Sequence, residues 1–135
     1  MATTYVLTMN EEQARQTIAA LDFWMRMRIG QWKELIDLCL PYEPGKADEY
    51  CEKREDAEKI LMQARQVVMP ELHGDGHSFG VYNFSETERA FNVLKAVRSA
   101  IAYHHKPEGG WTVDFDKPLA VHVVEEMPKC EAVEK

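Results

Sequence analysis

The stretch ARQTIAALDFWMRMRIGQWKELIDLC, residues 14–39, decides the fold that the sequence predicts. Apolar side chains recur in it at steps of three and four, the spacing that places one stripe along a helix. The stripe consists of Ala14, Ile18, Leu21, Met25, Ile29, Trp32, Ile36 and Cys39. The pattern predicts one long helix that ends near Leu40, because Pro41 stops it. Gly30 interrupts the middle and marks either close packing or a kink.

The residues before this stripe carry two alternative signals for the start of the helix. Thr8 with Glu11 has the spacing of a capping box, and Asn10 with Gln13 offers a variant of it. Both alternatives stay open. Residues 3–9, TTYVLTM, are few and rich in β-branched and aromatic side chains, a composition that predicts a strand.

Two further helices are predicted after the turn at PYEPGK. The first spans residues 47–68 and has an opposite face rich in charged side chains. Its apolar face consists of Ala47, Tyr50, Cys51, Ala57, Leu61, Ala64 and Val68. The second begins at Ser85, where SETE has capping-box spacing with Glu88, and ends near HHKPEGG. A short connection between two long apolar stripes predicts an antiparallel helical hairpin.

The C-terminal part adds short strands to this helical plan. WTVDFD at residues 111–116 and LAVHVV at residues 119–124 have strand-like composition. The predicted fold class is α+β, mainly α: an antiparallel long-helix hairpin plus a third helix, with a few short β-strands at the N-terminus, around residue 82 and at the C-terminus. One globular domain is expected over residues 1–125, followed by a polar, frayed tail at 126–135.

Composition and charge narrow the classes of function. The chain has 135 residues and a formal net charge of −7, so direct nucleic-acid binding is not expected. No apolar run approaches the roughly 20 residues of a membrane helix, and the first residues lack the features of a signal peptide. We therefore expect a cytoplasmic protein without a cofactor. Cys39 and Cys51 are expected to be reduced core residues.

The segment HGDGHSFGVYN, residues 73–83, is the candidate functional loop. His73, Asp75 and His77 supply metal-ligand atoms, but their spacing matches no known zinc motif, so no metal is expected. A metal-dependent enzyme at these three residues is kept as an alternative. No catalytic constellation is recognisable, and the chain is expected to be non-enzymatic.

An anionic ligand suits the loop better. Backbone amides at Gly74 and Gly76 could approach an oxygen, and the aromatic side chains could stack on a base. The candidate ligand-binding residues of the loop are His73, Gly74, Gly76, His77, Phe79, Tyr82 and Asn83. The candidate residues that neutralise a phosphate are Arg89, Arg98, His104, His105 and Lys106.

Self-association is the expected assembly. Trp24, Met27 and Arg28 lie off the main apolar stripe of residues 14–39. A helix that is apolar on two sides is typical of one that packs within its subunit and also against a partner. We therefore expect a homo-oligomer.

Three segments carry a resemblance: LTMNEEQARQTIAALDFWMRMRIGQWKEL, FGVYNFSETERAFNVLKAVR and PEGGWTVDF. Together they resemble a group of small uncharacterised accessory proteins of tailed bacteriophages and prophages, across most of the chain. The resemblance implies a non-enzymatic, oligomeric protein that acts in the cytoplasm of a host cell. It transfers no site residue.

Three hypotheses for function follow. The first is an anti-defence protein that sequesters a nucleotide second messenger. The second is an acidic inhibitor that binds a basic host protein through the helix at residues 47–68, where it could imitate DNA. The third is the metal-dependent enzyme at His73, Asp75 and His77.

Overall fold

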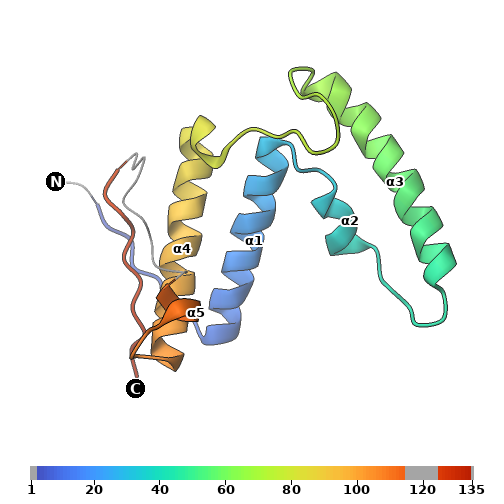
Figure 1. Cartoon of the computed structure of the whole chain (residues 1–135). Coiled ribbons are helices and arrows are strands. Elements are labelled where there is room, and N and C mark those ends of the chain that lie inside the picture. The colour runs from blue at the N-terminus through green and yellow to red at the C-terminus, as the bar shows by residue number, and fades with distance from the viewer. Residues whose placement is uncertain (1–2, 115–124, 135) are drawn as a thin grey trace. The chain divides into compact units, whose positions relative to one another are not determined.

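The computed structural model describes residues 3–114 and 125–134, and all regular structure in that part of the chain is helical (Figure 1). The elements are α1 (Glu11–Ile29), α2 (Glu34–Cys39), α3 (Ala47–Val68), the 3-10 turn η1 (Val81–Asn83), α4 (Ser85–His105) and α5 (Trp111–Asp114). Contacts divide the described chain into two compact units. The terminal unit runs up to Asp22 and resumes at Glu88, and the central unit is Phe23–Thr87.

The β-strands predicted at the N-terminus, around residue 82 and from residue 111 are wrong in the part of the chain that the structure describes, which is mainly helical as expected. No strand forms within residues 3–114 or 125–134. Residues 3–9 have no regular structure, and Tyr5, Val6 and Leu7 are 90%, 91% and 74% exposed. A strand needs a partner for its backbone groups, and none is formed here. The strand predicted at residues 119–124, and the end of the preceding one at 115–116, lie outside the described residues.

Two local hydrogen-bond patterns explain the other missing strands. Around residue 82, the Asn83 N–H donates to Gly80 O at 3.1 Å and closes a 3-10 turn, and the Asn83 side-chain oxygen accepts from the Gly80 N–H at 2.8 Å. At the C-terminal end, Gly110 O accepts from the N–H groups of Val113 and Asp114 at 3.0 and 2.8 Å. These bonds make the short helix α5, so β-propensity is overridden by local turns.

The long first helix breaks at Gly30. It was expected to continue to Leu40, but α1 ends at Ile29 and α2 begins only at Glu34. Gly30 is buried and has φ = 98°, a left-handed conformation that favours glycine at the end of a helix. The first arm of the predicted hairpin is therefore two helices, and close packing at Gly30 comes with the break.

The start of α1 selects one of the two predicted caps. Asn10 N–H donates to the Gln13 side-chain oxygen at 3.0 Å, and Gln13 N–H donates to the Asn10 side-chain oxygen at 2.8 Å. This reciprocal pair is the Asn10 variant of the capping box. At α4 the predicted Ser85 and Glu88 box does not form in the described residues, because Ser85 Oγ donates to Glu86 and the Glu88 side chain is buried.

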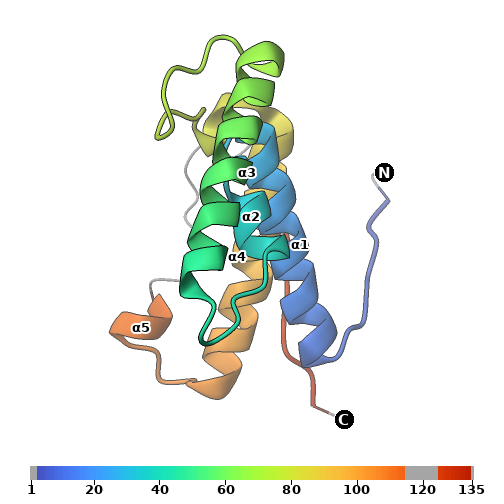
Figure 2. The ribbon, with the colours of Figure 1, turned by 90° about the vertical axis from the view of Figure 1, so that its right-hand side faces the viewer.

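In the central unit, α2 and α3 are in contact. Figures 1 and 2 show the two helices next to each other. Arg54 of α3 joins them, with Nη1 at 2.6 Å from Asp37 Oδ1. The buried apolar side chains of this unit are Met25, Ile29, Ile36, Met69 and Leu72. Hydrophobic burial in this unit therefore involves the end of α1, α2, the end of α3 and the segment after α3.

The bounds of α3 are as predicted, but its buried face is not. Ala64 and Val68 are exposed, and so are Cys39 and Cys51, which were expected in the core. The buried side chain of α3 is instead Arg65. Arg65 can be buried because it has hydrogen-bond acceptors in the interior of the unit.

In the terminal unit, α4 supplies most of the buried side chains. The buried apolar side chains are Ala90, Leu94, Ala96 and Val97 of α4, with Ala14 from α1 and Val113 from α5. The Tyr103 hydroxyl donates to Asp114 Oδ1 at 2.5 Å and ties α5 to the end of α4. This hydrogen bond raises the pKa of Tyr103. Among the described residues, no helix is both long and apolar enough to cross a membrane.

Replacing Gly30 by alanine tests the break in the first helix. A Cβ there would overlap the Cδ1 methyl of Leu72, a fully buried side chain, in addition to forcing alanine into a positive φ. We expect Gly30→Ala to lower the free energy of unfolding by about 3 kcal/mol. The measurement is urea unfolding followed by circular dichroism.

Gly45→Ala is the matched control. Gly45 also has a positive φ, of 84°, but no atom lies within 4 Å of the Cβ that it would gain. We expect a loss of only about 1 kcal/mol from the backbone conformation alone. Equal losses for the two variants would show that the packing of Gly30 against Leu72 is unimportant.

Candidate functional site

The candidate loop at residues 73–83 is fixed to the rest of the central unit by Arg65. This side chain is 4% exposed, and its guanidinium donates to three backbone carbonyls. The distances are 3.0 Å to Gly30 O, 2.9 Å to His77 O and 2.5 Å to Gly74 O. A planar guanidinium can serve several acceptors at once because it carries five N–H donors in a fixed fork. Arg65 thereby joins α3, the end of α1 and the loop.

The two loop histidines contact each other and do not converge on a metal. His77 Nδ1 accepts from the His73 backbone N–H at 2.8 Å, and the rings stack with a centroid distance of 6.3 Å. Asp75 pairs with Lys33 at 3.0 Å. Among the described residues, no group of three His, Cys, Asp or Glu side chains is placed to hold a metal ion.

The aromatic part of the loop is largely used for internal packing. Phe79 packs edge-on against Phe84, with ring centroids 5.3 Å apart, and the Phe79 N–H donates to Ile29 O at 2.9 Å. Arg28 stacks over Phe84 at 3.7 Å from the ring centroid and pairs with Glu86 at 3.3 Å. Asn83 closes the turn η1. Two residues were expected to stack on a base: Tyr82 is exposed, whereas Phe79 is half-buried.

The sequence reasoning missed Arg65, although a signal was present. Ala57, Leu61, Arg65 and Met69 follow one another at steps of four, which places the arginine on the apolar side of the helix. A charged side chain at such a position must be paired or hydrogen bonded. The spacing predicts burial, but the three acceptors come from distant parts of the chain and have no sequence signature.

A shallow hollow of ≈ 310 Å³ lies in the terminal unit between α1 and α4. Its lining residues are Arg15 and Ile18 of α1 and Arg98, Ile101, Ala102 and His105 of α4. Two guanidinium groups and an imidazole therefore line the same hollow as three apolar side chains, Ile18, Ile101 and Ala102, which we call its apolar floor. We call this set the cationic hollow. It includes two of the predicted phosphate-neutralising residues, Arg98 and His105, and it adds Arg15, which was not predicted.

A carboxylate of the chain itself lies at the edge of the cationic hollow. Glu11 accepts a hydrogen bond from Arg15 Nε at 3.2 Å and also contacts His105 Nε2. The hydrogen bond with His105, with a smaller contribution from Arg15, holds the pKa of Glu11 below its ordinary value. The environment of Arg15 and His105 thus favours a negative charge.

The other predicted cationic residues lie outside the lining of this hollow. Arg89 pairs with Glu125 at 2.8 Å. His104 packs edge-on against His105 with ring centroids 5.4 Å apart, and Lys106 is exposed just after the end of α4. The predicted site residues therefore fall into two groups, one on the loop of the central unit and one on α4 of the terminal unit.

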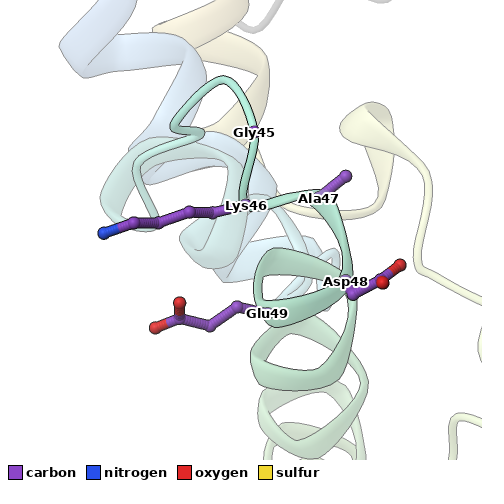
Figure 3. Close-up of a pocket in the computed structure, with 5 residues that line it drawn as sticks. All are labelled: Gly45, Lys46, Ala47, Asp48 and Glu49. Atoms are coloured by element: carbon purple, nitrogen blue, oxygen red, sulfur yellow. The ribbon is translucent and has the colours of Figure 1, made fainter.

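A second hollow lies at the start of α3, lined by Gly45, Lys46, Ala47, Asp48 and Glu49. Figure 3 shows that the Lys46 and Glu49 side chains extend to one side of the helix and that Asp48 points to the other. Side chains that diverge in this way do not form a set of contacts around one ligand. The cationic hollow is therefore the better candidate for a binding site.

Substituting Arg65 tests the fixing of the loop. Lysine keeps the charge but donates from a single nitrogen, which cannot reach three carbonyls in the same way. We expect Arg65→Lys to lower the free energy of unfolding by about 2–4 kcal/mol because buried acceptors lose their donors. In hydrogen exchange, the Phe79 amide should lose protection. Lys59→Met is the control, and this exposed change should stay within about 0.5 kcal/mol.

Comparison with known proteins identifies no relative. No family model, no curated protein and no solved structure matches the chain. The function proposed next rests on the residues of the cationic hollow and of the loop.

Proposed function

We propose that the protein binds a small anionic ligand with an apolar part, possessing no catalytic activity of its own. The observation that supports this proposal is the cationic hollow. Arg15, Arg98 and His105 lie around Ile18, Ile101 and Ala102 in one unit of the chain. Charged donors beside an apolar floor are the usual composition of a site for a small organic anion.

The chemistry of the hollow fits a nucleotide. Guanidinium groups bind phosphate through charge-assisted hydrogen bonds, and a protonated imidazole adds a further donor. Apolar side chains beside them offer a surface for the flat face of a base. The resemblance to phage accessory proteins adds the context: a nucleotide second messenger of the host, sequestered so that the host defence is not activated.

Binding without turnover is favoured by what lines the hollow. Its residues are arginine, isoleucine, alanine and histidine, so it has no hydroxyl or thiol nucleophile. A covalent intermediate on serine, threonine or cysteine would need such a group beside a base. Glu11, next to His105, already pairs with the cationic side chains.

Ligand binding by the loop at residues 73–83 remains a prediction, and so does the assembly of a homo-oligomer. Tyr82, His73, Gly74 and Gly76 are exposed and could still contact a ligand. Of the residues from which self-association was predicted, Trp24 is 46% exposed, whereas Arg28 is engaged with Phe84 and Glu86 in its own chain. Native mass spectrometry reports the mass of any oligomer together with any ligand that it retains.

The test is a titration with a panel of cyclic and linear adenine and guanine nucleotides, read by isothermal calorimetry and by melting temperature. At least one nucleotide should bind and raise the melting temperature by mass action. Arg98→Met should lower the affinity for that nucleotide about tenfold or more, because a charged hydrogen bond is lost. Inorganic phosphate, which lacks the apolar part, should bind more weakly.

Arg89→Met is the matched control on the same helix. Arg89 pairs with Glu125 and does not line the hollow, so its removal should leave the affinity unchanged. Tyr82→Ala in the same titration tests the loop independently. If no nucleotide binds, or if Arg98→Met binds as tightly as the natural protein does, the hollow is not the site.

A further inference from the structure

Helix α3 presents three sides with different chemistry. One side carries the buried Arg65. A second side carries carboxylates at spacings of four, three and one, which fall together on a helix. We call these residues the acidic stripe: Asp48, Glu52, Glu55 and Asp56. All four are exposed, and none forms an ion pair with another described residue.

The third side of α3 is apolar and exposed. Ile60, Val67 and Val68 are 66%, 82% and 65% exposed, and Ala64 is exposed between them. Their spacing of four, three and one makes one continuous surface over the last turns of the helix. We call these four residues the apolar stripe. Scattered apolar residues on a surface need no explanation, but a row on one side of a helix is typical of a binding surface.

The two stripes follow each other along α3. The acidic stripe occupies the first turns of the helix and the apolar stripe the last ones. The stretch from Glu34 to Glu58 contains nine acidic and three basic residues, so the negative charge extends beyond the stripe itself. The two stripes lie on adjoining sides of the helix, so a molecule that crosses α3 obliquely would meet carboxylates at one end and apolar side chains at the other.

We infer that this surface binds a basic amphipathic segment of another protein. Apolar side chains of the segment cover the apolar stripe, and its lysine or arginine side chains pair with the acidic stripe. Charge complementarity identifies this occupant, since the acidic carboxylates have no ion-pair partner among the described residues. The inference concerns the central unit alone and does not depend on the anionic ligand proposed for the terminal unit.

A second copy of the chain fits the surface less well. In a parallel pair that buries the two apolar stripes against each other, the carboxylates of the acidic stripe would gain no positive partner. In an antiparallel pair, the apolar stripe would meet the same side of the first turns, where Glu49 and Lys53 continue its line at steps of three and four. Burying those charged side chains against apolar ones is costly.

A designed peptide tests the inference. The probe is a helical peptide of leucine and lysine, about 18 residues long, with its leucines at steps of three and four along one side. Its binding to the full chain is measured by fluorescence anisotropy at low and high salt. We expect binding that weakens as salt rises, because part of the affinity comes from exposed charge pairs. A scrambled peptide of the same composition should bind at least about tenfold more weakly.

Two double variants separate the stripes. Ile60→Ser with Val67→Ser should weaken peptide binding about tenfold or more, through lost apolar burial. Glu52→Gln with Glu55→Gln should weaken it at low salt and reduce the salt dependence. The control, Glu12→Gln with Glu131→Gln, makes the same charge change on exposed residues of the terminal unit and should bind like the natural chain.

Because all the substituted side chains are exposed, the variants should keep the natural circular dichroism spectrum and melting temperature. Three results would overturn the inference. They are equal binding of the scrambled peptide, unchanged affinity of the Ile60 and Val67 variant, and a dimer in analytical ultracentrifugation that this variant abolishes. The last result would assign the surface to a second copy.

Discussion

The buried guanidinium of Arg65 is the interaction on which the central unit depends. It satisfies carbonyls at the end of α1 and in the loop after α3, and so joins both segments to α3. Hydrophobic contact alone would hold these three segments together less specifically. A buried positive charge is costly, and here backbone dipoles offset that cost in place of a carboxylate. The glycine break at the end of α1 belongs to the same arrangement, since Gly30 O is one of the acceptors and Gly30 packs against Leu72.

The helices were predictable because their signals are local. The strand predictions were wrong because a strand also depends on residues far away in the chain. The apolar repeat of α1 and its reciprocal Asn10 and Gln13 cap involve only residues of that segment. The residue pattern that predicted α3 is likewise contained in α3. Strands depend on partners elsewhere in the chain, so the β-branched composition of residues 3–9 could not establish one. The sequence indicated that Gly30 could interrupt the helix, but the residue that packs closely against it, Leu72, lies more than forty residues away in the chain.

The candidate site was predictable only in its residue types. Arg98 and His105 were identified as cations for an anion, and the structure places both beside an apolar floor. Arg15 was not identified as a candidate cation, because nothing in its own segment indicates which side chains of α4 line the hollow with it. The loop residues illustrate the converse. Glycines and histidines that suggested a ligand cradle also serve the loop itself, through the bonds of Gly74 O, His77 O and His77 Nδ1.

For the proposed anion site, the carboxylate of Glu11 is a competitor that the chain itself supplies. Glu11 is tethered to α1, so its effective concentration at Arg15 and His105 is on the order of millimolar or higher whatever the solution contains. A simple anion must compete with this built-in counter-ion and gains nothing from the apolar floor. A ligand that carries more than one negative charge, or that also covers Ile18 and Ile101, can exceed it. If the hollow binds an anion as proposed, this competition would favour a larger organic anion over an inorganic one.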